Sequence, residues 1–248
     1  MWRYVAPEFE NEYRTVLLDL PGSGAAAAAS YDAQRHATLD GYRDDLVALL
    51  QELGLSSVVL VGHSVSAMIG VLLHIARPDL VERLVLVTPS ARYLDDVDYA
   101  GGFSAGDIDE LLELMSRNHL GWQNPLATLV AGDPDSAAHG ELEQAFCRTR
   151  PEIAAQFAEV TFRGDNRADL SAVSAPTLVL QSAEDIIAPP SAVSFVRDAI
   201  PGAQSEVIAT RGHCPHLSAP SETVSAIRRF LRTSRPFLTD RAGRAGRT

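Results

Sequence analysis

LVGHSVSAMIG, residues 60–70, joins a short run rich in β-branched residues to a run with apolar residues nearly all round. The first run predicts a buried strand over 57–61, and the second predicts a helix over 67–76. Ser64 lies between them, so the chain must turn sharply at this serine. A strand, a tight turn and a helix in this order predict an α/β fold with Ser64 exposed at the end of a strand.

The residues around Ser64 fit a tight turn that carries a nucleophile. Gly62-x-Ser64-x-Ser66 is close to the pattern G-x-S-x-G, with serine in place of the second glycine. Ser66 is also small, so it keeps the steric tolerance that the turn requires. The backbone N–H of Val65 begins the following helix, and we expect it to face an oxyanion that forms at Ser64.

Composition excludes several classes of function. The chain has 248 residues, 46% of them hydrophobic, and a formal net charge of −11, which argues against nucleic-acid binding. All its basic side chains are arginine, so no lysine can form a Schiff base or serve a phosphate loop. No apolar run approaches the roughly 20 residues of a membrane span. No secretory signal is visible, and with only Cys147 and Cys214 we expect a reduced, cytoplasmic protein.

Strand and helix patterns alternate up to residue 90. We expect strands over 14–20, 57–61 and 83–87, and helices over 2–12, 38–53 and 67–76. This alternation predicts a mostly parallel sheet with helices on both faces.

The alternation stops after residue 90. Helical patterns near 106–118, 119–131, 138–148 and 151–162 follow without a convincing strand. The sheet resumes with strands over 176–180 and 205–209 and helices over 191–200 and 221–231. We therefore expect core segments 1–90 and 174–231, a helical lid over 91–173, and a disordered tail over 232–248. The lid should cover the carboxyl ends of the strands, where ligands bind in such sheets.

A base and an acid for Ser64 follow the last two predicted strands. A serine hydroxyl needs a base, and the base needs an orienting carboxylate. Sheet enzymes of this kind place them in the chain order serine, acid, histidine. This order selects Asp185 as the acid and His213 as the base. Glu184 is an alternative acid, but neighbouring side chains point in different directions and only one can reach His213.

The remaining histidines and cysteines have structural explanations. We expect His63, His74 and His216 to pack against neighbouring elements, and Cys214 to serve as a small buried residue. The sequence contains no His-Glu-x-x-His or Cys-x-x-Cys spacing, so it predicts no metal site and no cofactor.

Five stretches carry a resemblance to a known family. They are TLDGY (38–42), VGHSVSAMIG (61–70), DYAGGF (98–103), DIIAP (185–189) and GHCPHL (212–217). They resemble the RsbQ group of α/β hydrolases, which includes the plant karrikin and strigolactone receptors. The resemblance implies an α/β-hydrolase fold with a four-helix lid over a small hydrophobic pocket. It also implies that Phe162, and with it Trp122, lines that pocket.

The resemblance further implies a role and a missing segment. Bacterial members act with a PAS-domain phosphatase upstream of a general-stress sigma factor, and the resemblance favours a monomer. Members also carry a strand and an oxyanion loop ahead of the segment that begins at Trp2. We therefore expect N-terminal strands to be missing here and the true start to lie upstream of Met1. Loss of one oxyanion donor would slow catalysis on the order of a hundredfold, which makes activity of this chain an open question.

The leading hypothesis is a serine hydrolase of a small hydrophobic ester or lactone that serves as a ligand sensor. The alternatives are a non-catalytic or degenerate signalling protein on the same fold, and a cofactor-free C–C hydrolase or perhydrolase. A haloalkane dehalogenase is disfavoured, because it would need an acid at position 64.

Overall fold

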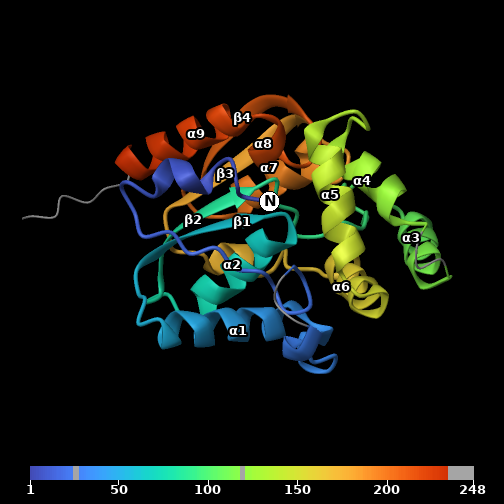
Figure 1. Ribbon diagram of the computed structural model, residues 1–248. Helices are drawn as coiled ribbons and strands as arrows, with labels where there is room; N and C mark the ends of the chain where they lie inside the picture. The colour runs from blue at the N-terminus through green and yellow to red at the C-terminus, as the bar shows by residue number, and fades with distance from the viewer. Residues whose placement is uncertain (25–27, 118–120, 234–248) are drawn as a thin grey trace, which may run out of the picture.

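Four parallel strands form the centre of the molecule. The computed structural model describes residues 1–24, 28–117 and 121–233. In these residues β1 (Val58–His63), β2 (Val81–Val87), β3 (Thr177–Glu184) and β4 (Gln204–Arg211) lie in the order β1-β2-β3-β4 (Figure 1). All three pairings are parallel, as the alternation of strands and helices predicts.

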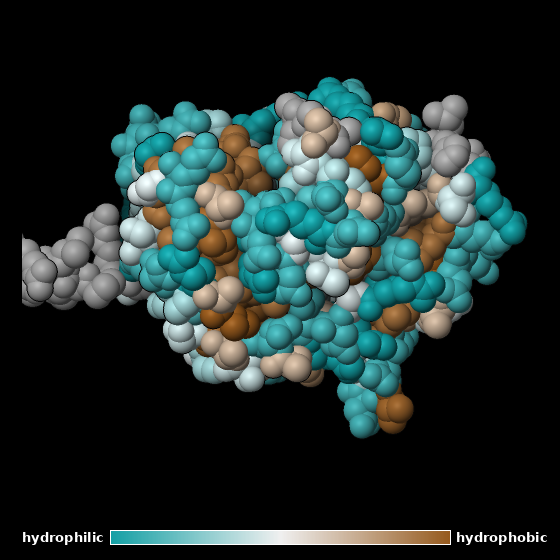
Figure 2. All heavy atoms as spheres, turned by 90° about the horizontal axis from the view of Figure 1, so that it is seen from below, coloured by the Kyte–Doolittle hydropathy of each residue, from teal (hydrophilic) through white to brown (hydrophobic). Residues whose placement is uncertain are grey.

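Helices cover both faces of the sheet. Side chains alternate along a strand, so Leu84 and Leu86 of β2 enter one core and Val85 and Val87 enter another. The first core includes residues of α1 (Leu39–Glu52), α2 (Val65–Ala76) and α7 (Pro190–Ala199). The second includes residues of α9 (Pro220–Thr233) and of the 3-10 helix η1 (Ala6–Phe9). Figure 2 shows the face on the α1 side, where mostly hydrophilic residues cover the core and hydrophobic ones show between them.

Four further helices separate β2 from β3. They are α3 (Ala105–Arg117), α4 (Gln123–Ala131), α5 (Ala137–Arg148) and α6 (Pro151–Arg163). They gather beyond one end of the strands (Figure 1) and share an apolar cluster with Tyr93, Ile187 and Cys214. Their positions agree with the four helical patterns of the sequence. Short helices η2 (Ala28–Ser30), η3 (Arg35–Ala37), η4 (Leu170–Ala172) and α8 (Pro215–Ser218) complete the described elements.

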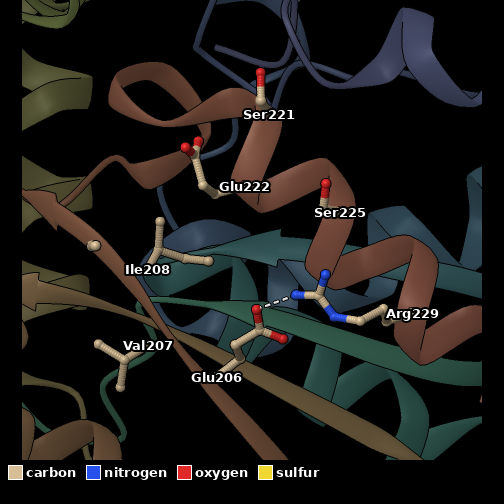
Figure 3. A pocket seen from close by; sticks show the side chains of 8 residues that line it. Glu206, Val207, Ile208, Ser221, Glu222, Ser225 and Arg229 are labelled. Carbon is tan, nitrogen blue, oxygen red and sulfur yellow. Dashed lines mark hydrogen bonds and ion pairs between the residues drawn. The ribbon is translucent and has the colours of Figure 1, made fainter.

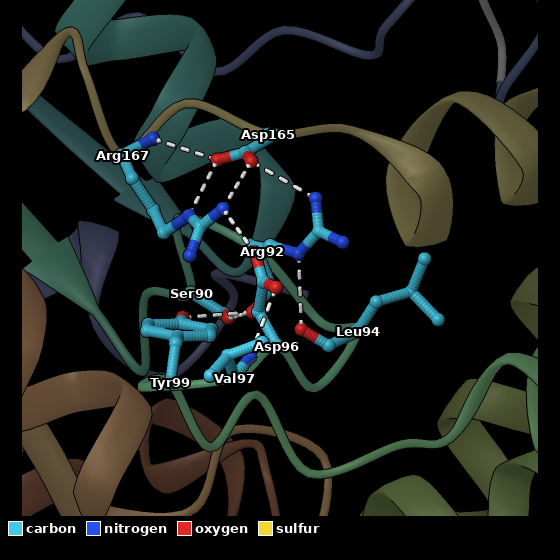
Figure 4. Close-up of polar contacts among 8 residues, drawn as sticks. All are labelled: Ser90, Arg92, Leu94, Asp96, Val97, Tyr99, Asp165 and Arg167. Carbon is cyan, nitrogen blue, oxygen red and sulfur yellow. Dashed lines mark hydrogen bonds and ion pairs between the residues drawn. The ribbon is translucent and has the colours of Figure 1, made fainter.

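Ion pairs join the two ends of this helical segment (Figure 4). Asp165, after α6, accepts from Arg92 at 2.9 Å and from Arg167 at 2.7 Å. Arg167 also contacts Asp96 at 2.9 Å and lies over the ring of Tyr99, 5.0 Å from its centroid. The chain therefore enters and leaves the helical segment at neighbouring points.

The N-terminal expectations are partly wrong. Only Ala6–Phe9 is helical within the predicted helix 2–12, and it is a 3-10 turn with a proline in its first positions. Residues 14–20 form no strand; Leu17 is 61% exposed, and β1 pairs with β2 alone in the described sheet. An extended segment becomes a strand only when it pairs with a neighbouring strand, and none of the four described strands pairs with residues 14–20. The predicted tail falls largely on 234–248, outside the described residues.

Within the described parts of the chain, the structure contains no helix that is both long and apolar enough to span a membrane.

A substitution at Gly62 can test the turn at Ser64, on which the fold depends. A Cβ at this position would lie 2.5 Å from the carbonyl oxygen of Ser66. We expect Gly62→Ala to lower the midpoint of thermal unfolding, because overpacking costs about 1–3 kcal/mol. Gly140→Ala in α5 is the matched control, since a Cβ there meets no atom within 4 Å and alanine favours a helix over glycine by about 1 kcal/mol. Equal midpoints for the two variants in circular dichroism would contradict this account.

Candidate active site

Ser64 lies in a strained turn between β1 and α2. Its φ of 57° and ψ of −127° lie outside the regions that L-residues ordinarily adopt. The N–H of Ser64 donates to the carbonyl of Val87 at the end of β2, at 2.9 Å. Such strain persists only where the surroundings impose it, and it is concentrated at functional sites.

Ser64, His213 and Asp185 form one chain of hydrogen bonds. His213 Nε2 lies 2.8 Å from Ser64 Oγ, and His213 Nδ1 lies 2.7 Å from Asp185 Oδ2. A carboxylate only accepts, so Nδ1 carries the proton and Nε2 presents its lone pair to the serine hydroxyl. Folding therefore brings the three predicted residues together in the tautomer that a general base requires.

Backbone donors fix the orientation of Asp185. The N–H groups of Ile187 and Ala188 donate to Oδ1 at 2.9 and 3.1 Å, which leaves Oδ2 for His213. Glu184 instead is exposed and pairs with Arg211 at 2.7 Å. The structure thus places Asp185, and not Glu184, against the imidazole.

The loop that carries His213 is held from several sides. Gly212 has a φ of +91°, and a Cβ there would lie 2.1 Å from the carbonyl oxygen of Ala131. The N–H of His213 donates to the carbonyl of Val130 at 2.8 Å, so the end of α4 sets the position of this loop. The carbonyl of His213 accepts from Thr88 Oγ1 at 2.9 Å.

Val65 is the first residue of α2. The first N–H groups of a helix have no acceptor within the helix. The N–H of Val65 is therefore available beside Ser64, at the positive end of the helix dipole.

Tyr93 is a site residue that the sequence reasoning missed. Its hydroxyl lies 2.9 Å from Ser64 Oγ, and its side chain is buried. Burial raises the pKa of Tyr93 above that of a free tyrosine, so the phenol stays protonated. Since Ser64 donates to His213, Tyr93 donates to Ser64. Tyr93 follows β2 by a few residues, so it lies at the same edge of the sheet as Ser64. An aromatic residue at this position in the sequence is a signal that could have identified Tyr93.

Phe162 and Trp122 are both buried but occupy different surroundings. The ring of Phe162 packs edge-on against Tyr93, with 5.1 Å between centroids, so that the side chain of Tyr93 alone separates Phe162 from Ser64. The ring of Trp122 packs against Phe146 at 5.5 Å. The contacts thus connect Phe162, and not Trp122, to the triad through a single side chain.

Two surface hollows lie away from the triad. One of about 340 Å³ lies between β4 and α9, where Glu206 pairs with Arg229 (Figure 3). The other, of about 440 Å³, has Gly132 and Arg211 in its wall. Neither of these two described hollows is lined by Ser64, Asp185 or His213.

A second cluster lies behind His213. His63 Nε2 donates to the carbonyl of His213 at 2.7 Å and lies 3.8 Å from Cys214 Sγ. Burial and the nearby His213 ring lower the pKa of His63 to about 3, so this imidazole is neutral. Burial also raises the pKa of the Cys214 thiol. His216 completes the cluster, and its ring stacks on Trp2 with 4.4 Å between centroids.

Comparison with known proteins places the chain in a family. The alpha/beta hydrolase fold family model matches residues 1–220. The chain is 39% identical to karrikin insensitive 2 receptor CA of Petunia hybrida, over 93% of this chain and 86% of that protein. It is 38% identical to strigolactone esterase D14 of Arabidopsis thaliana, again over 93% and 86%.

A solved structure shows the same fold. A hydrolase from Oleispira antarctica superimposes with a TM-score of 0.91 at 35% identity, covering 94% of this chain and 86% of that one. The family match and this superposition agree with the fold described above. The chain therefore belongs to the α/β hydrolase family, among relatives that include a plant karrikin insensitive 2 receptor and a plant strigolactone esterase.

Proposed function

We propose that this protein is a serine hydrolase of small apolar esters or lactones and that it also senses its ligand. The observation that carries the proposal is the hydrogen-bond chain from Ser64 through His213 to Asp185, with distances of 2.8 and 2.7 Å. These three hydrogen-bonded residues lie at the carboxyl ends of parallel strands, beside an apolar cluster of α3–α6. The catalytic steps need no metal and no cofactor.

The geometry supports acyl transfer in two steps. Ser64 Oγ attacks the substrate carbonyl while its proton moves to His213 Nε2, and the Val65 N–H donates to the oxyanion. His213 then gives this proton to the leaving alkoxide, and an acyl-serine remains. In the second step a water molecule gives its proton to His213 and attacks the acyl carbon, and the returned proton restores Ser64. Asp185 stabilises the imidazolium in both steps.

The surroundings of Ser64 favour an apolar substrate of modest size. Tyr93, Phe103 and Phe162 form a line of aromatic contacts that begins at the nucleophile, with ring centroids 5.1 and 6.0 Å apart. Aromatic and aliphatic side chains bind apolar groups without demanding hydrogen bonds. A relative named as a strigolactone esterase agrees with an ester or lactone of this kind.

Contacts between the helical segment and the triad support a sensing role. Phe162 of α6 touches Tyr93, which holds Ser64, and Val130 of α4 accepts from the His213 loop. A ligand that displaces Tyr93 or Phe162 would change the surface of α3–α6 that a partner meets. A relative named as a receptor supports this interpretation.

The resemblance to the RsbQ group suggests the setting of this signal. The partner would be a PAS-domain phosphatase in a stress response, and the protein would act as a cytoplasmic monomer. Its two cysteines are free, one exposed and one buried, which agrees with a reducing compartment.

Binding without turnover is the alternative function. Val65 is the one backbone donor assigned to the oxyanion, and a hydrolase with a single donor would be slow. A C–C hydrolase or perhydrolase would use the same three residues, so only measured products separate these reactions from ester hydrolysis.

Ser64 should be the site of covalent labelling. We expect an active-site phosphonate to label the protein on Ser64, because His213 activates this hydroxyl. Ser64→Ala should abolish labelling and ester hydrolysis, whereas Ser66→Ala, two residues along the same turn, should retain both. Intact-mass spectrometry after labelling provides the measurement. A folded protein that takes up no phosphonate would leave the binding alternative.

Asp185 should control the tautomer of His213. Asp185→Asn can still accept from Ile187 and Ala188, but its amide would donate toward Nδ1 and favour the wrong tautomer. We expect kcat to fall by about 10⁴, as for other triads of this type, with little change in the unfolding midpoint. Glu184→Gln is the matched control, since Glu184 contacts the exposed Arg211. A comparable loss in both variants would argue against the assigned role.

Ligand binding should alter α3–α6 if the protein is a sensor. Ser64→Ala should bind an uncleaved lactone, and hydrogen–deuterium exchange with and without it should change most in α4 and α6, which contact the triad loops. Exchange in residues 227–231 of α9, which pack on the other face of the sheet, serves as the internal reference. Unchanged exchange throughout α3–α6 at saturating lactone would contradict sensing and leave hydrolysis intact.

A further inference from the structure

Three potential metal ligands from two distant parts of the sequence meet behind the catalytic histidine. One ligand atom each from His63, Cys214 and His216 lie within 4.8 Å of one another. His63 Nε2 and Cys214 Sγ are 3.8 Å apart. Two ligands on a tetrahedral zinc ion, with bonds near 2.0 and 2.3 Å, are separated by about 3.5 Å. The pair is therefore close to the spacing that zinc requires.

His216 has an unused hydrogen-bonding capacity in this cluster. Its side chain is fully buried, and among the described residues neither ring nitrogen has a hydrogen-bond partner. Burying a polar group without a partner costs about 1–3 kcal/mol. Trp2 stacks on the face of the ring and leaves the in-plane nitrogen lone pair available. A ligand that accepts electron density from this nitrogen would satisfy it.

We propose that His63, Cys214 and His216 bind one zinc ion. One thiolate and two neutral imidazoles are a donor set that zinc prefers over magnesium or calcium. On binding, the Cys214 thiol releases one proton to solvent, and His63 moves its proton from Nε2 to Nδ1. His63 is the least buried of the three ligands, so we expect the ion to enter from its side and a water molecule to take the fourth position.

Zinc at this site would affect the neighbouring base. Coordination removes the hydrogen bond from His63 to the carbonyl of His213, although Thr88 Oγ1 still donates to that oxygen. Cys214 is the next residue after His213, so its movement toward the ion shifts the imidazole relative to Ser64. Zinc bound at this site would therefore inhibit hydrolysis reversibly, an effect that rests on the hydrolase function proposed above.

Cobalt substitution tests the site without relying on activity. Titration of the metal-free protein with Co²⁺ should give a thiolate-to-cobalt charge-transfer band, visible bands typical of tetrahedral cobalt, and one equivalent bound. Cys214→Ser and His216→Gln should weaken Zn²⁺ binding in calorimetry by more than about 100-fold, since even loss of an outer-shell partner costs 10- to 100-fold. Cys147→Ser is the matched control, because Cys147 is exposed and outside the cluster.

X-ray absorption covers the case in which these variants do not fold. Zinc bound to Cys147→Ser, with all three ligands intact, should show one sulfur and two imidazole nitrogens in its shell. A shell without sulfur, or no binding, would overturn the proposal.

Ser64→Ala should bind zinc normally, so failure of the hydrolase proposal would leave this result unchanged. In an active wild-type enzyme, Zn²⁺ at about ten times its Kd should remove about nine-tenths of the hydrolysis by mass action, and Cys214→Ser should escape this loss. Equal inhibition of the wild-type enzyme and of Cys214→Ser would contradict inhibition through this site.

Discussion

The sharp turn at Ser64 is the constraint on which the rest of the structure depends. A non-glycine residue at a φ of 57° is held there only because β1 and α2 are both anchored. The turn leaves no space for a Cβ at Gly62, and it needs the Val87 carbonyl as an acceptor for the Ser64 N–H. Parallel order then brings the ends of β2, β3 and β4 to the same edge of the sheet, where the other site residues lie.

Thr88 is a second strained residue at this edge of the sheet, and both Ser64 and Thr88 contact His213. Thr88 has a φ of +45° directly after β2, and its hydroxyl donates to the carbonyl of His213. The base is thus oriented at its ring by Asp185 and at its backbone by Thr88 and Val130. A catalytic group held at both its side chain and its main chain needs little reorganisation during a reaction.

Local sequence patterns predicted much of the fold and of the candidate site. The strand–turn–helix around Ser64 and the four amphipathic helices were predictable, because each depends on periodicity within a short window. The placement of Asp185 and His213 followed from strand order. Residues 14–20 were misjudged, since an apolar run becomes a strand only beside a partner. Tyr93 and the His63–Cys214–His216 cluster were missed, because their meaning arises from contacts between residues far apart in sequence.

The ion pairs of Arg92, Asp165 and Arg167 have a consequence for how such a fold can diversify. They bring the start and end of the α3–α6 segment side by side, with Arg92 and Asp165 also joined in an isolated antiparallel bridge. A segment whose ends already meet adds little loop-closure entropy, and its loss or replacement leaves the strand pairings untouched. The interior of the helical segment can therefore change in length and sequence, and so in substrate range, provided that α4 keeps its contact with the His213 loop.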